Sequence, residues 1–196
     1  MPTIRDIAGL PSVPASLSDS ALVMIDCQNT YREGVMQLEG VEEALQRAAA
    51  LLARAREAGV PVFHIQHDAG VGSPYDITAD NGQIAEVVAP KGDEPVIVKN
   101  LPDSFAATDL QQQLEATGKK NLVLAGFMSH MCVNSTARSG FDKGYAVSVV
   151  ENTTATRALP DGKGGTLSAA DVQKASLCGL ADLVAIIVED ADQIPD

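Results

Sequence analysis

Three residues have the types that nucleophilic catalysis needs, and each lies near the end of a short apolar run. Asp26 follows "ALVMI", Lys99 closes "PVIVK", and Cys132 comes shortly after "NLVLAG". A free thiol, with a pKa of about 8.5, is mostly protonated at neutral pH, and a neighbouring base and cation favour the thiolate. Asp26 and Lys99 would supply that base and that cation, in the general arrangement of an activated nucleophile.

The segments that must position these residues alternate between short apolar runs and longer helical patterns. Continuous apolar runs are typical of strands covered on both faces, and apolar residues three or four apart predict helices. The expected strands are 21–26, 60–67, 95–99, 121–126, 145–152 and 182–188; the expected helices are 40–58, 109–118, 131–143 and 168–180, with a short one in 82–88. The glycine-rich stretch 160–165 predicts a loop.

This alternation predicts an α/β fold in which a single domain spans residues 1–196. We expect three layers, α/β/α, around a Rossmann-like, six-stranded and mainly parallel sheet, with residues 1–19 as an N-terminal extension. Ligands of such a sheet bind at the carboxyl ends of its strands. Asp26 and Lys99 end two strands, and Cys132 would lie in the first turn of a helix, where the helix dipole favours a thiolate.

Composition excludes several classes of partner. The net charge is −12, and aromatic residues make up 4% of the chain with no Trp, so nucleic acids and anionic membranes are disfavoured. No apolar run approaches the ~18 residues of a membrane span, and the first twenty residues lack the apolar core of a signal peptide. Three cysteines without CxxC spacing indicate neither a disulfide framework nor a zinc ribbon, which predicts a cytoplasmic location.

Cofactor and metal motifs are missing from the sequence. There is no GxGxxG after a strand, no GxxxxGK[ST] and no HExxH. His64 and His67 are three residues apart, which places them on opposite faces of a strand and makes them a poor metal pair. We therefore expect no cofactor and no metal.

Three separate segments resemble one known family. They are "VMIDCQNTY" (23–31), "VIVKNLPDSF" (96–105) and "AGFMSHMCVNSTARSGFDKGYAVSVVENTTATR" (125–157). Their order and content resemble the isochorismatase-like cysteine hydrolases, which include nicotinamidases and N-carbamoylsarcosine amidohydrolase. The likeness extends from about residue 20 to residue 188, nearly the whole chain.

The resemblance implies a catalytic triad of Asp26, Lys99 and Cys132 and a homo-oligomer. It implies a cis peptide bond between Phe127 and Met128, and an oxyanion hole built from the N–H groups of Met128 and Cys132. The implied reaction cleaves a C–N bond of a small amide or carbamoyl compound through a thioester on Cys132. The substrate-binding candidates are Tyr31, Gln66, His67, Phe105, Ser129 and His130.

Several alternatives stay open at this point. Tyr31 and Phe105 could be core aromatics, and His67 could be a loop histidine. The stretch "HIQHDAGVGS" does not match the metal motif of nicotinamidases. Isochorismatases proper lack the cysteine and cleave a vinyl ether, a reaction for which Gln66 would be a substrate-binding residue. The chain could also be a non-catalytic, oligomeric binding or redox protein, with Cys132 as an oxidisable thiol.

Overall fold

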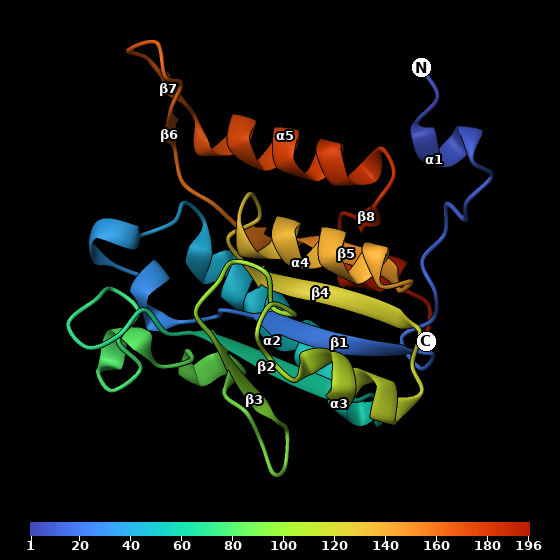
Figure 1. Ribbon diagram of the computed structural model, residues 1–196, viewed down its shortest axis with the longest axis horizontal. Helices are drawn as coiled ribbons and strands as arrows, with labels where there is room; N and C mark the ends of the chain where they lie inside the picture. Colours follow the sequence, from blue (N-terminus) through green and yellow to red (C-terminus); the bar gives the residue numbers. More distant parts are fainter.

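Six parallel strands form the sheet at the centre of the computed structural model, which describes residues 1–196. They are β1 (Ser20–Ile25), β2 (Val62–His67), β3 (Val96–Lys99), β4 (Asn121–Phe127), β5 (Ala146–Ala155) and β8 (Ala185–Val188). Their order across the sheet is β3-β2-β1-β4-β5-β8, and every neighbouring pair is parallel. All carboxyl ends therefore meet at one edge, on the left of Figure 1.

Helices cover both faces of the sheet. On one face lies α2 (Val41–Glu57); on the other lie α3 (Leu110–Thr117), α4 (Cys132–Asp142) and α5 (Ala169–Ala181) (Figure 1). Side chains of β1 alternate between the two cores: Leu22 and Met24 join the cluster under α2, whereas Val23 and Ile25 join the cluster under the other helices. Burial on both faces explains the continuous apolar run of this strand.

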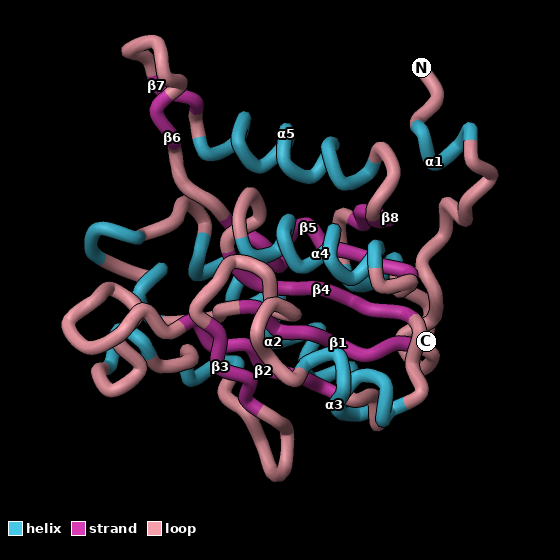
Figure 2. Tube along the Cα trace, viewed as in Figure 1, coloured by secondary structure: helices cyan, strands magenta, loops and turns pink.

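The predicted three-layer α/β/α fold is confirmed, with each main element within a few residues of its expected bounds. The short helix expected in 82–88 is wrong: two 3-10 turns, Asp80–Gly82 and Glu86–Val88, stand there. Further 3-10 turns lie at Asn29–Tyr31, Gly34–Met36 and Ala191–Gln193. The loop expected at 160–165 is found at 161–165. It connects the two short strands of a hairpin, β6 (Leu159–Pro160) and β7 (Thr166–Leu167), which projects at the top left of Figure 2.

The N-terminal extension packs against the body of the domain. It contains the short helix α1 (Ile4–Ile7), which Thr3 caps through the backbone N–H of Asp6. The Arg5 side chain donates to the carbonyl of Leu183 at 2.7 Å, and its backbone N–H donates to the carbonyl of Asp182 at 2.8 Å. These contacts join the extension to the turn between α5 and β8. None of the helices combines the length and the apolar character that crossing a membrane requires.

Gly126 brings β1 and β4 unusually close together at their carboxyl ends. Its φ is +113°, and a Cβ added there would lie 2.0 Å from the carbonyl oxygen of Ile25. A side chain at this position would push the two strands apart. Gly126 thus fixes the distance between the segment that carries Asp26 and the segment that leads to Cys132.

Candidate active site

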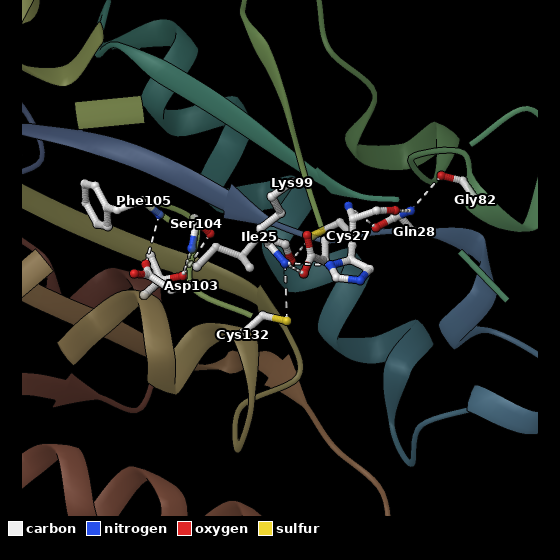
Figure 3. Close-up of polar contacts among 12 residues, drawn as sticks. Ile25, Cys27, Gln28, Gly82, Lys99, Asp103, Ser104, Phe105 and Cys132 are labelled. Atoms are coloured by element: carbon white, nitrogen blue, oxygen red, sulfur yellow. Dashed lines mark hydrogen bonds and ion pairs between the residues drawn. The ribbon is translucent and has the colours of Figure 1, made fainter. Parts of the chain in front are cut away.

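The three predicted catalytic residues come together at the carboxyl edge of the sheet. Lys99 Nζ lies 2.7 Å from Asp26 Oδ2 and donates to Cys132 Sγ at 3.4 Å (Figure 3). All three residues are buried: Asp26 is 0%, Lys99 2% and Cys132 5% exposed. Buried charges are stable only when paired, so the ion pair between Lys99 and Asp26 explains how both can lie here.

Asp26 leaves β1 with an unusual backbone. Its φ is +47°, in the left-handed region, which aspartate enters more readily than most residues. The Asp26 N–H still donates to the carbonyl of Ile65 on β2. The Asp26 carbonyl accepts from the backbone N–H of Gln28, two residues later, at 2.8 Å. The chain therefore turns sharply at Asp26, and the carboxylate stays at the strand end.

Cys132 is the first residue of α4 and follows a tight loop. The peptide bond between Phe127 and Met128 is cis. Within this loop, the N–H groups of Ser129 and Met131 donate to backbone carbonyls, whereas those of Met128, His130 and Cys132 donate to no acceptor in the protein. The N–H groups of Met128 and Cys132 are the ones named for the oxyanion hole, and the helix dipole favours an anion near Cys132.

The protonation of this cluster differs from the expected thiolate. Burial and the nearby Asp26 carboxylate, against the opposing effect of Lys99, together raise the pKa of Cys132 to about 12. Burial also raises the pKa of Asp26, again against Lys99, which makes it a stronger base than a free aspartate. Asp26 Oδ1 is buried and has no hydrogen-bond partner. At rest these shifts favour a thiol beside a base, and the thiolate expected at Cys132 stays a prediction for the reaction itself.

Of the predicted substrate-binding residues, His67 contacts this cluster directly, and Tyr31 is linked to His67 through the ring of Tyr75. His67 Nδ1 is 3.1 Å from Lys99 Nζ, and its ring packs edge-on against Tyr75, with centroids 4.9 Å apart. Tyr31 is buried and packs edge-on against Tyr75 and Phe127. Burial raises the pKa of Tyr31, and the negative charge of Asp26 adds to the rise.

Gln66, Ser129 and His130 use their side chains in hydrogen bonds within the protein. Gln66 Nε2 donates to the carbonyl of Gly82 at 2.8 Å. The buried Ser129 hydroxyl donates to Gln173 on α5. His130 Nδ1 lies 2.6 Å from Thr156 Oγ1. These bonds hold the surrounding segments in place, and a substrate role for the three residues stays a prediction.

Phe105 lies apart from the reacting atoms. It is stacked on Tyr145, with centroids 6.0 Å apart and an interplanar angle of 23°. Tyr145 follows the C-terminal end of α4, whereas Cys132 begins that helix, and eleven residues of helix span about 16 Å. Figure 3 also shows Phe105 well separated from Cys132. We therefore correct the pocket-wall assignment: Phe105 is a core aromatic.

The two histidines of β2 are held by different partners. His64 Nε2 lies 2.9 Å from Glu94 Oε2, and Glu94 also pairs with Arg56 at 2.7 Å. His67 instead contacts Lys99. Nowhere do three or more His, Cys, Asp or Glu side chains converge in a way that could hold a metal ion.

The sequence did not single out two residues that contact the site, Gln28 and Tyr75. Gln28 is fully buried and its amide bonds the backbone of His67 and of Gly82. Its position two residues after Asp26 is the one signal that could have drawn attention to it. Tyr75 comes from the long segment after β2, and no pattern in that segment predicts its path.

Comparison with known proteins agrees with the fold and the motifs. A family model described as Isochorismatase domain matches residues 20–188. The chain is 36% identical over 195 residues to the secreted isochorismatase effector Isc1 of Verticillium dahliae, across 98% of this chain and 99% of that relative. It is 33% identical over 147 residues to a maleamate amidohydrolase of Pseudomonas putida, across 66% of this chain and 69% of that relative.

The crystal structure of an isochorismatase from Pseudomonas putida KT2440 has the same fold, with a TM-score of 0.95, 34% identity and 99% coverage of both chains. The parallel sheet covered by helices on both faces, with a site at the carboxyl ends of its strands, makes this an α/β protein. The chain belongs to the isochorismatase family, and it is a hydrolase of that family.

Proposed function

We propose that the protein is a cysteine amidohydrolase that cleaves a C–N bond of a small amide or carbamoyl compound. One observation carries this proposal: the Lys99 ammonium contacts both the Asp26 carboxylate and the Cys132 thiol in a buried site. Similarity to the maleamate amidohydrolase, whose name states an amide substrate, supports the same reaction class.

The first half of the reaction forms a thioester. Asp26 takes the thiol proton as Cys132 Sγ attacks the amide carbonyl, and Lys99 stabilises the charges that remain. The N–H groups of Met128 and Cys132 donate to the oxyanion of the tetrahedral intermediate. Collapse of the intermediate breaks the C–N bond, and the protonated Asp26 gives its proton to the leaving amine.

The second half releases the acid. Asp26 takes a proton from a water molecule, which attacks the thioester carbonyl, and the thiol leaves with that proton. A raised pKa suits Asp26 to both tasks, because a general acid–base works best when its pKa lies near the working pH. Every step uses groups of this chain, and none calls for a cofactor.

The substrate enters this proposal as a class. Tyr31, Gln66, Ser129 and His130 are the side chains expected to surround it. The homo-oligomer that the family resemblance implies and the cytoplasmic location that the cysteine content predicts both stay predictions.

A screen for ammonia release tests the proposal. Wild-type protein is assayed against small amides, carbamoyl compounds and nitrogen heterocycles, and Cys132→Ser against every compound that is turned over. We expect Cys132→Ser to lose about 10³-fold or more of the activity, because a hydroxyl is a much weaker nucleophile at this site. Cys178→Ser, at an exposed position, is the matched control and should keep full activity.

The opposite outcome has a specific meaning. Turnover that survives in Cys132→Ser would contradict the thioester route. Isochorismate cleavage by both proteins would then favour the vinyl-ether reaction, in which no cysteine takes part.

A further inference from the structure

The Lys99 ammonium has three acceptors around it, and one of them is not part of the triad. An ammonium has three N–H groups and no acceptor. Its neighbours are Asp26 Oδ2 at 2.7 Å, His67 Nδ1 at 3.1 Å and Cys132 Sγ at 3.4 Å. Because Lys99 can only donate, Nδ1 must be the acceptor. His67 is therefore neutral at this contact, with its proton on Nε2.

His67 itself is fixed by a buried amide. The His67 N–H donates to Gln28 Oε1 at 2.8 Å, and Gln28 Nε2 donates back to the His67 carbonyl at 2.9 Å. The second hydrogen of Gln28 Nε2 goes to the carbonyl of Gly82 at 2.7 Å (Figure 3). The amide acts as a strand partner for β2 at the point where β1 turns away at Asp26. The same turn thus positions the carboxylate and, through Gln28, the imidazole.

The charged groups around His67 determine the pH range in which its Nδ1 can accept a hydrogen bond from Lys99. Burial and the Lys99 ammonium lower its pKa, whereas the carboxylates of Asp26 and Asp68 raise it, and the sum is a pKa below the ordinary value. The ring of Tyr75 covers one side. Protonation at lower pH would remove the acceptor and place a second cation against Lys99.

We propose that His67 is a positioning residue, whose Nδ1 orients Lys99 toward Asp26 and Cys132, rather than a substrate-binding residue. The inference rests on the proposed function, in which Lys99 acts on the thiol. Gln28 contributes to this positioning, because its amide binds the backbone of His67 and so holds the imidazole in place.

Two substitutions separate the acceptor from the bulk of the ring. In His67→Asn the amide oxygen takes the place of Nδ1 and cannot be protonated, and His67→Leu has no acceptor. The readout is alkylation of Cys132 by iodoacetamide between about pH 5 and 8, measured by peptide mass spectrometry with the exposed Cys178 as the reference in each molecule.

The expected pattern has three parts. Relative to Cys178, wild-type Cys132 should react more slowly as the pH falls below the ordinary histidine pKa. His67→Leu should be about tenfold slower than wild type at neutral pH, the effect of losing one charge-assisted hydrogen bond. His67→Asn should stay within about threefold of wild type and should lose the acid-side decrease.

Other results would overturn the positioning role. A His67→Leu profile equal to wild type would show that no acceptor is needed, and a His67→Asn profile equal to His67→Leu would show that the ring, rather than its Nδ1, matters. Either result leaves amide hydrolysis by Cys132 standing, because the ammonia screen tests that separately.

A second measurement covers the case in which His67→Leu does not fold. In ¹⁵N-histidine NMR of the wild-type protein, with only three histidines to assign, His67 should be the neutral Nε2–H tautomer with Nδ1 accepting. Its Nδ1 resonance should move in Lys99→Met. A charged His67 at neutral pH, or an Nδ1–H tautomer, would contradict the proposal.

Discussion

Lys99→Met is expected to lower amide turnover by about 10³-fold or more, the size of effect seen when a group that acts as part of a catalytic unit is removed. The ammonium contacts both reacting partners, so its loss leaves Asp26 and Cys132 without a cation. The pKa of the Cys132 thiol should then rise further, because Lys99 is the group that lowers it. Steady-state rates on an amide from the screen measure the loss.

The same substitution should destabilise the fold by about 3–5 kcal/mol, because it strands a buried carboxylate. The effect depends on pH with a definite sign. Without Lys99 the pKa of Asp26 rises further, so the folded state holds a proton that the unfolded state releases, and stability falls as the pH rises from about 4. Urea unfolding near pH 4 and pH 7 should show the larger difference from wild type at pH 7.

Two further variants make this result interpretable. Lys163→Met removes an exposed lysine from the tip of the β6–β7 hairpin and should match wild type in both stability and rate. Combining Lys99→Met with Asp26→Asn removes both charges and should recover part of the lost stability without recovering turnover. A single Lys99→Met variant that is as stable and as active as wild type would contradict the role given to the ion pair.

Asp26→Asn is expected to lower both the amide turnover and the pKa of the Cys132 thiol. Turnover should fall by about 10³-fold or more, because the variant has no general base for the thiol and no acid for the leaving amine. The pKa of Cys132 should fall, because the negative charge that raises it is gone while Lys99 remains. Asparagine tolerates the left-handed backbone of this position, so the turn after β1 should survive.

Absorbance at 240 nm as a function of pH reports the thiolate, and ammonia release reports turnover. Asp68→Asn is the control, because Asp68 is a neighbouring carboxylate outside the catalytic cluster. This variant should keep the rate of ammonia release within about threefold of wild type. If the thiol pKa of Asp26→Asn rose or if its turnover were preserved, Asp26 would not be the base.

The sequence was most informative about residues at strand ends. A parallel sheet brings the carboxyl ends of its strands to one edge, so Asp26, Lys99 and the segment before Cys132 could be assigned to one site from apolar runs alone. Their three-way contact also depended on the order of the strands, on the close approach at Gly126 and on the loop that leads to Cys132. The same reasoning placed Gln66 and His67 at the end of β2.

Loop-borne features were out of reach for physical reasons. Tyr75 and Gly82 lie on the long connection between β2 and β3, where no periodic pattern defines the backbone. The sequence shows the helix dipole and the lysine that favour a thiolate at Cys132, whereas the burial that raises the pKa of this thiol becomes visible only in the structure. Phe105 was misplaced because a motif match gives a position in the chain and no contact.

The central claim is that Cys132 carries the acyl group during turnover, and mass spectrometry of acid-quenched protein tests it most directly. Wild-type protein mixed with a substrate from the ammonia screen should gain the mass of the acyl group on the peptide that contains Cys132. Hydroxylamine should remove that mass as the hydroxamate. An acyl mass on another residue, or ammonia release at an unchanged rate by Cys132→Ser without any adduct, would contradict the account.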